Sequence, residues 1–183
     1  MSVLGRIFVS QIIVVLHNIR SVYNVGAILR TCEGLGIDEA VFSGYTPRYE
    51  DAGLLPHLRE KLNRQIEKSA LGAEKMVPQE AVEDLAGWLA AKRGEGWTIV
   101  GLENNLAPEE MAKRWVLGAE DMELGGLEKV ALILGEEVNG IPAEVRREVD
   151  FFLEIPMRGR KESFNVSVAT GIALWGIQQA ERR

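Results

Sequence analysis

The distribution of apolar residues along the chain predicts alternating strands and helices. Five short runs are rich in β-branched and other apolar residues, and four of them are apolar almost throughout. Such runs are typical of strands that helices cover on both faces of a parallel sheet. The predicted strands are residues 12–16 (IIVVL), 40–44 (AVFSG), 97–101 (WTIVG), 130–134 (VALIL) and 151–155 (FFLEI).

Between the predicted strands, apolar residues recur at the spacing of one helical face. The predicted helices are residues 22–35, 57–70, 80–93, 109–116, 143–149 and 164–179. The alternation of strands and helices predicts an α/β fold, with a mainly parallel sheet and helices on both faces. Residues 45–56 and the glycine-rich residues 117–127 are predicted to be surface loops.

Polar or glycine-rich segments follow three of the predicted strands. They are residues 17–20 (HNIR), residues 135–140 (GEEVNG), and a loop that carries Arg158, Arg160 and Lys161. The carboxyl ends of parallel strands meet at one edge of a sheet, where open α/β folds bind their ligands. The sequence therefore predicts a binding site at that edge.

The length and composition exclude several classes of protein. A chain of 183 residues is most simply one domain, and we expect a single domain over residues 1–183. The single cysteine excludes an intramolecular disulfide, and the two histidines are too few and too far apart in sequence to suggest a metal cluster, so no metal is expected. The sequence has no apolar run of about 20 residues and no signal-peptide pattern, so we expect a cytoplasmic protein without a membrane partner.

The charge distribution leaves a nucleic-acid partner open. A net charge of −6 argues against such a partner. The charges are segregated, however: residues 1–32 hold three arginines and no acid, residues 155–161 sum to +3, and residues 103–129 hold seven acids against three bases. A basic face on an acidic body and an ordinary patchy surface both fit this distribution.

The common nucleotide and hydrolase motifs are absent. No G-x-G-x-x-G follows a strand, and the sequence has neither a P-loop nor a G-x-S-x-G elbow. Three other segments occur in order: residues 24–44 (NVGAILRTCEGLGIDEAVFSG), 132–142 (LILGEEVNGIP) and 155–175 (IPMRGRKESFNVSVATGIALW). Together they closely resemble the three motifs of the SpoU (TrmH-like) branch of the SPOUT RNA methyltransferases.

The resemblance covers nearly the whole chain, without a separate RNA-binding extension. It implies a C-terminal trefoil knot, a homodimer, and S-adenosylmethionine as methyl donor to a ribose 2′-hydroxyl of RNA, with tRNA favoured over rRNA. It assigns the active site to Asn24, Arg30, Glu137, Ser163 and Asn165. It assigns the cofactor to Leu102, Gly135, Ile155, Ser163 and Phe164. Arg20, Arg158, Arg160 and Lys161 are expected to meet RNA phosphates.

Structural roles compete with several of these assignments. Gly135 fits a tight turn, Ser163 or Asn165 fits a helix N-cap, and Ile155 and Phe164 fit an ordinary core. Glu137 can anchor Asn24 or Arg30, or accept hydrogen bonds from backbone N–H groups.

Arg30 is cast in the family as the group that removes the proton from the ribose. A guanidinium with a pKa above ~12 is a poor base near neutrality. We therefore hypothesise that its charge stabilises the developing alkoxide and holds the neighbouring phosphate.

Two functions from other classes remain. One is a non-catalytic RNA-binding or assembly factor that keeps the fold, and the other is a small-molecule methyltransferase. Residues 45–70 add further candidates for RNA contact, which are Arg48, Arg59, Lys61, Arg64 and Lys68.

Overall fold

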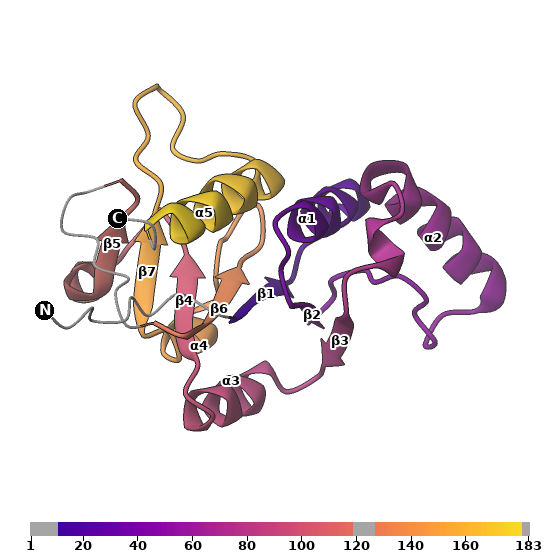
Figure 1. The fold of residues 1–183 in the computed structure, drawn as a ribbon, viewed down its shortest axis with the longest axis horizontal. Coiled ribbons are helices and arrows are strands. Elements are labelled where there is room, and N and C mark those ends of the chain that lie inside the picture. Colours follow the sequence, from indigo (N-terminus) through magenta and orange to yellow (C-terminus); the bar gives the residue numbers. More distant parts are fainter. Residues whose placement is uncertain (1–10, 119–126, 181–183) are drawn as a thin grey trace, which may run out of the picture.

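The structure is a computed structural model that describes residues 11–118 and 127–180. Within these residues a seven-stranded parallel sheet has the order β3-β2-β1-β6-β4-β7-β5 (Figure 1). The strands are β1 (Gln11–His17), β2 (Glu39–Ser43), β3 (Gln79–Val82), β4 (Thr98–Leu102), β5 (Arg114–Val116), β6 (Lys129–Leu134) and β7 (Phe151–Glu154). The predicted α/β fold with a mainly parallel sheet is confirmed.

Helices cover both faces of the sheet, as the apolar strands require. In Figure 1, α1 (Val22–Gly34) and α5 (Val166–Ala180) lie over one face, whereas α3 (Leu85–Gly94) and α4 (Ala143–Arg146) lie over the other. The helix α2 (Pro56–Ala70) packs against α1 at the end of the molecule. Successive β1 residues alternate between two cores: Leu16 joins α1 and α5, and Val15 joins α3 and α4.

The apolar spacing predicted one helix over residues 80–93, and this prediction is wrong. Residues 79–82 form the edge strand β3, which pairs with β2, and the helix α3 begins only at Leu85. Asp84 is its N-cap and accepts a hydrogen bond of 3.0 Å from the N–H of Gly87. Pairing with β2 outweighs a helical periodicity that extends too far toward the N-terminus.

Residues 109–116 also differ from their predicted helix. The segment is a 3₁₀ helix at Pro108–Lys113 followed by the strand β5, which pairs with β7. The ring of Trp115 stacks on that of Phe151, with the centroids 3.9 Å apart. This stacking and the pairing with β7 explain why these residues leave the helical conformation.

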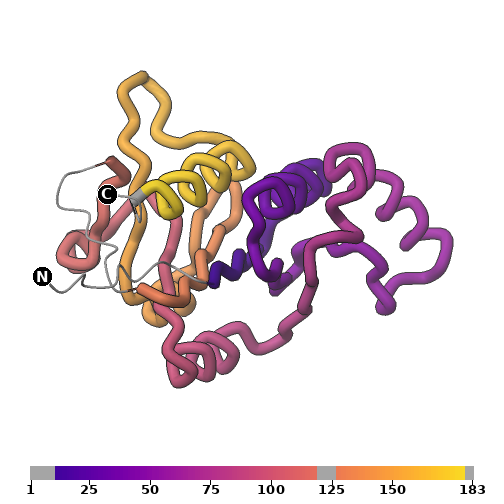
Figure 2. Tube along the Cα trace, in the orientation of Figure 1, coloured from indigo at the N-terminus to yellow at the C-terminus, as the bar shows by residue number. Residues whose placement is uncertain are grey.

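The path of the chain brings three strand ends together. β4 lies between β6 and β7 in the sheet, so the chain passes on both sides of β4 (Figure 2). The loops that leave the carboxyl ends of β4, β6 and β7 are therefore neighbours. Most of the predicted loop at residues 117–127 lies outside the described residues. Arg6, in the basic N-terminal segment, also lies outside them. Among those described, no helix is long and apolar enough to cross a membrane.

Candidate active site

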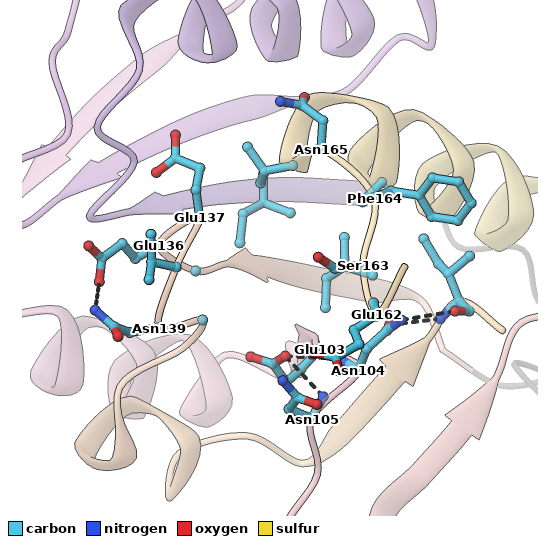
Figure 3. A pocket seen from close by; sticks show the side chains of 18 of the residues that line it. Glu103, Asn104, Asn105, Glu136, Glu137, Asn139, Glu162, Ser163, Phe164 and Asn165 are labelled. Carbon is cyan, nitrogen blue, oxygen red and sulfur yellow. Dashed lines mark hydrogen bonds between the residues drawn. The ribbon is translucent and has the colours of Figure 1, made fainter. Parts of the chain in front are cut away.

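A pocket of about 560 Å³ opens at the carboxyl ends of β4, β6 and β7 (Figure 3). Its walls are residues 102–105 after β4, residues 134–140 after β6, and residues 155 and 162–166 after β7. The edge of the sheet predicted from the polar segments is thus the edge that carries the pocket. In Figure 3, Glu137 and Asn165 lie on one side of it, and Glu103, Asn104 and Asn105 on the other.

All residues that the resemblance assigns to the cofactor line this pocket, namely Leu102, Gly135, Ile155, Ser163 and Phe164. A side chain at Gly135 would collide with the backbone of Gly140 and Ile141. The turn after β6 folds back on itself there, because Glu136 and Gly140 form a backbone bridge. Close packing within the turn therefore accounts for this glycine, as the structural alternative proposed.

Asn104 is a pocket residue that the sequence reasoning missed. Its Nδ2 donates to the carbonyl oxygens of Ile155 at 3.1 Å and of Glu162 at 3.3 Å. Its Oδ1 accepts from the N–H of Ile155 at 3.3 Å. Asn104 therefore ties the loop after β4 to the loop after β7. The polar residues that directly follow the buried strand β4 were the signal that could have revealed it.

Glu103 and Arg146 form a second tie that was not predicted. Glu103 Oε2 accepts from the N–H of Ile141 at 3.2 Å and lies 3.2 Å from Arg146 Nη1. Arg146 Nε also donates to Glu110 Oε1 at 2.8 Å, and this bonding lowers the pKa of Glu110 despite partial burial. The contacts of Glu103 with Ile141 and Arg146 therefore hold together the loops after β4 and β6, which form one wall of the pocket.

Three predicted active-site residues from distant parts of the chain are bonded in a row. Asn24 Nδ2 donates to Glu137 Oε1 at 2.9 Å, and Asn165 Nδ2 donates to Asn24 Oδ1 at 3.2 Å. Glu137 also accepts from the backbone N–H groups of Arg20 and Ser21, both at 3.2 Å. Glu137 thus anchors Asn24 and caps the chain before α1 within one protomer.

The environment of Glu137 keeps its carboxylate ionised. Burial opposes ionisation, but hydrogen bonds from Asn24 and from backbone N–H groups outweigh it and lower the pKa of Glu137. Because an ionised carboxylate only accepts hydrogen bonds, it orients the Asn24 amide with its oxygen toward Asn165.

Asn165 combines the structural and the proposed functional roles. Its Oδ1 accepts from the N–H of Ser167 at 3.0 Å and from the Ser167 hydroxyl at 2.7 Å, as an N-cap of α5 does. Its amide nitrogen remains free to bond Asn24. Ser163 lies in the pocket lining two residues earlier and is exposed.

Arg30 lies outside the pocket lining. It is exposed on α1, six residues beyond Asn24, which is about 9 Å along the helix axis. Within the described part of the chain its side chain makes no hydrogen bond or ion pair. The structure therefore brings Asn24, Glu137, Ser163 and Asn165 together, and leaves Arg30 on an exposed face of α1.

The residues expected to bind RNA fall into two groups. Arg20 forms an ion pair with Glu136, and its Nε donates to the Tyr45 hydroxyl at 3.3 Å. Arg158, Arg160 and Lys161 are exposed on the long loop between β7 and α5, which extends away from the sheet in Figure 1. In the described residues these three cations have no acidic partner.

The basic residues of the segment 45–70 divide in the same way. Arg48 pairs with Asp51 at 3.0 Å and Arg59 with Glu50 at 3.7 Å. The others are exposed on one face of α2, at positions three and four apart, and find no acidic partner among the residues described: they are Lys61, Arg64 and Lys68.

Comparisons with known proteins agree on one family. The family model described as "SpoU rRNA Methylase family" matches residues 11–175. The 23S rRNA (guanosine-2'-O-)-methyltransferase RlmB of Pseudomonas putida is 30% identical over 172 residues, which are 94% of this chain and 60% of that protein. The tRNA (guanosine(18)-2'-O)-methyltransferase TARBP1 of Mus musculus is 29% identical over 91% of this chain and 9% of its own length.

Solved structures share the fold. The AdoMet-bound rRNA methyltransferase from Sinorhizobium meliloti superposes with a TM-score of 0.72 at 22% identity, over 95% of this chain and 58% of that one. This chain spans about three-fifths of the RlmB proteins that it matches.

Proposed function

The chain belongs to the SpoU rRNA methylase family, and on this premise we propose that it methylates a ribose 2′-hydroxyl of RNA with S-adenosylmethionine. The observation that carries the proposal is the row Glu137–Asn24–Asn165, which joins all three motifs at the mouth of the pocket. The names of the relatives RlmB and TARBP1 support 2′-O-methylation as the reaction.

The pocket fits this methyl donor in size and charge. Its volume of about 560 Å³ is typical of small-molecule sites. Its described lining holds four glutamates and one arginine, a sum of −3, which favours a cationic sulfonium and disfavours a nucleotide phosphate. The glutamates are Glu103, Glu136, Glu137 and Glu162, and the arginine is Arg146. Leu102, Ile155 and Phe164 supply apolar surface for a flat ring.

The residues of the chain then act by position and charge. S-adenosylmethionine supplies an activated methyl group, so the protein has to align the ribose oxygen with it and exclude water. The Asn24 and Asn165 amides, held by Glu137, are placed to orient the ribose. The Arg30 guanidinium stabilises the alkoxide as it develops, and the ribose proton is lost in concert with methyl transfer or to a water molecule at the edge of the site.

We propose a homodimer through α1 and α5. These helices pack against each other and expose large apolar side chains, namely Tyr23, Val168 and Trp175. Arg30 follows Tyr23 by seven residues, or about two helical turns, so both lie on the same side of α1. Burial of that side against a second copy would carry Arg30 to the interface, within reach of the partner's pocket.

Two expectations of the resemblance remain proposals. The trefoil knot is supported by family membership and by the position of β4 between β6 and β7. The preference for tRNA is not favoured by the relatives, whose names include both rRNA and tRNA enzymes. A cytoplasmic location likewise stays a prediction.

One experiment tests the reaction. The protein is incubated with labelled S-adenosylmethionine and with separate pools of unmodified transfer and ribosomal RNA, and the product nucleosides are identified by mass spectrometry. We expect a 2′-O-methylnucleoside in one pool. Binding of RNA without methylation would support a non-catalytic factor, and methylation of a small molecule without RNA would support the other alternative.

A further inference from the structure

A second concave region lies on the edge of the sheet that carries the main pocket. It measures about 370 Å³ and lies at the carboxyl ends of β2 and β3. Phe42 and Val82, near the ends of these strands, provide its apolar lining. Arg48, Asp51 and Glu83 provide donors and acceptors around it. The proposed methyl transfer uses none of these groups.

An exposed aromatic ring stands beside this region on a rigid turn. Tyr45 is 53% exposed, although it lies only two residues beyond the buried end of β2. Gly44 before it has a φ of 62°, and any side chain there would collide with Asn18. The backbone N–H of Tyr45 donates to Asn18 Oδ1 at 3.3 Å, and Asn18 Nδ2 bonds His17 Nε2 at 3.0 Å. The turn therefore fixes where the ring stands.

Arg20 connects the ring with the main pocket. Its guanidinium carbon lies 5.9 Å from the centroid of the Tyr45 ring, a cation–π distance, and its Nε donates to the Tyr45 hydroxyl at 3.3 Å. The same guanidinium pairs with Glu136, which lines the main pocket. A planar cation and an aromatic ring are thus held together at the side of the main pocket.

Resting on the proposed function, we infer that Tyr45 and Arg20 form a stacking platform for a nucleobase of the RNA substrate. Exposed bases of RNA stack on aromatic rings and on arginine planes. The edge of the stacked base faces the concave region, where Arg48 offers donors and Asp51 and Glu83 offer acceptors.

The distance between the two sites suits one strand of RNA. β2 and β6 are separated in the sheet only by β1, so their carboxyl ends lie roughly 10 Å apart. A strand whose ribose enters the main pocket can therefore place a neighbouring base on Tyr45. The arrangement makes this base a determinant of which RNA is accepted.

Two substitutions of Tyr45 separate stacking from a structural role. Tyr45→Phe keeps the ring and removes the hydroxyl that bonds Arg20, whereas Tyr45→Ala removes both. Met76→Ala, at an exposed apolar side chain outside both pockets, is the control. Fluorescence anisotropy with a labelled single-stranded RNA of mixed sequence measures binding, and steady-state kinetics measures the KM for RNA and for S-adenosylmethionine.

Stacking predicts that Tyr45→Ala raises the Kd for RNA about 5- to 150-fold, the range for loss of one stacked base. Tyr45→Phe and Met76→Ala should stay near the wild-type value, and the KM for S-adenosylmethionine should not change. An unchanged Kd in Tyr45→Ala, or an equal loss in Tyr45→Phe, would overturn the inference. A wild-type protein that binds RNA but forms no methylated product would refute the proposed function. The anisotropy measurement needs no turnover, so it would still decide whether a base stacks on Tyr45.

Discussion

The carboxylate of Glu137 accepts a hydrogen bond of 2.9 Å from the side-chain amide of Asn24, across 113 positions of sequence. Asn24 is on the first helix and Glu137 is in the turn after β6, so the bond joins two of the three motifs. Asn165 adds the third through its bond to Asn24. The bond to Glu137 holds the Asn24 amide in position for a substrate and leaves the pocket itself open.

Glu137→Gln is expected to lower kcat about tenfold or more, because a neutral amide holds Asn24 less firmly than a carboxylate does. Thermal stability should also fall modestly, because Glu137 accepts hydrogen bonds from the backbone N–H groups of Arg20 and Ser21, so activity is compared at a temperature where both variants are folded. Methyl transfer to RNA is the measurement. Glu109→Gln, at an exposed glutamate outside the pocket lining, is the matched control and should keep wild-type activity. Equal activity in both variants would remove Glu137 from the site.

Arg30→Lys is expected to retain most activity, whereas Arg30→Ala should lose about 100-fold or more in kcat, because we assign the role to positive charge. Glu33→Gln, on the same helix and also exposed, is the control. If the lysine variant is as inactive as the alanine variant, the two-pronged geometry of the guanidinium or action as a base is required.

Mixed dimers show which pocket Arg30 serves. Chains with Arg30→Ala and chains with Glu137→Gln are unfolded together and refolded. If Arg30 completes the partner's pocket, a mixed dimer contains one intact site, and activity should rise above that of either variant alone. No gain on mixing would mean that Arg30 and Glu137 must come from one chain.

If the proposed dimer forms through α1 and α5, Trp175→Glu is expected to convert it to a monomer, because the substitution places a charge in an apolar interface. Light scattering after size-exclusion chromatography measures the mass. Val138→Glu replaces an apolar side chain that is also highly exposed but lies outside α1 and α5, so this control should stay dimeric. A wild-type monomer, or a dimeric Trp175→Glu variant, would refute the proposed interface.

The exposed cations of α2 are expected to bind RNA phosphates. Single reversals Lys61→Glu, Arg64→Glu and Lys68→Glu should each weaken RNA binding, and each should reduce the slope of log K against log salt by about 0.7–0.9. Arg147→Glu, an exposed arginine in the turn after α4, is the control. Salt titrations of RNA binding make the comparison. If the salt-dependence slopes of all three variants equal that of the wild type, RNA does not bind at α2.

Stability should decrease below pH ~6.5 because of His17. Burial lowers the pKa of His17 from its ordinary value of 6.5, against an opposing effect of Glu144. The unfolded chain therefore binds the proton more readily, and the free energy of unfolding falls as the pH drops from about 6.5 toward the folded-state pKa. One such group contributes a slope of at most about 1.4 kcal/mol per pH unit.

Two histidine variants test this pH dependence by chemical denaturation. His17→Gln should flatten the slope of stability between pH 7 and the folded-state pKa. His57→Gln, at an exposed histidine, should keep the wild-type slope. The Asn18 amide donates to His17 Nε2, which places the proton of the neutral ring on Nδ1, toward the Ser43 hydroxyl at 2.8 Å. An unchanged slope in His17→Gln would mean that another group titrates.

The sequence by itself determined the central strands and the edge of the sheet that carries the site. The runs at residues 12–16 and 130–134 are apolar throughout because both faces of β1 and β6 are buried, and this burial is visible in local composition. The order of the three motifs indicated the family, and all five residues assigned to the cofactor line one pocket.

The tertiary structure alone decided what depends on distant partners. β3 and β5 have only four and three residues, too few for a periodic pattern, and they become strands because β2 and β7 offer them hydrogen bonds. Asn104 and Arg146 join the pocket because loops far apart in sequence meet there. The local sequence pattern indicates whether a residue is buried. The partner that buries it or bonds to it is decided by the order of strands in the sheet. That order also places Asn24 against Glu137 and leaves Arg30 facing outward.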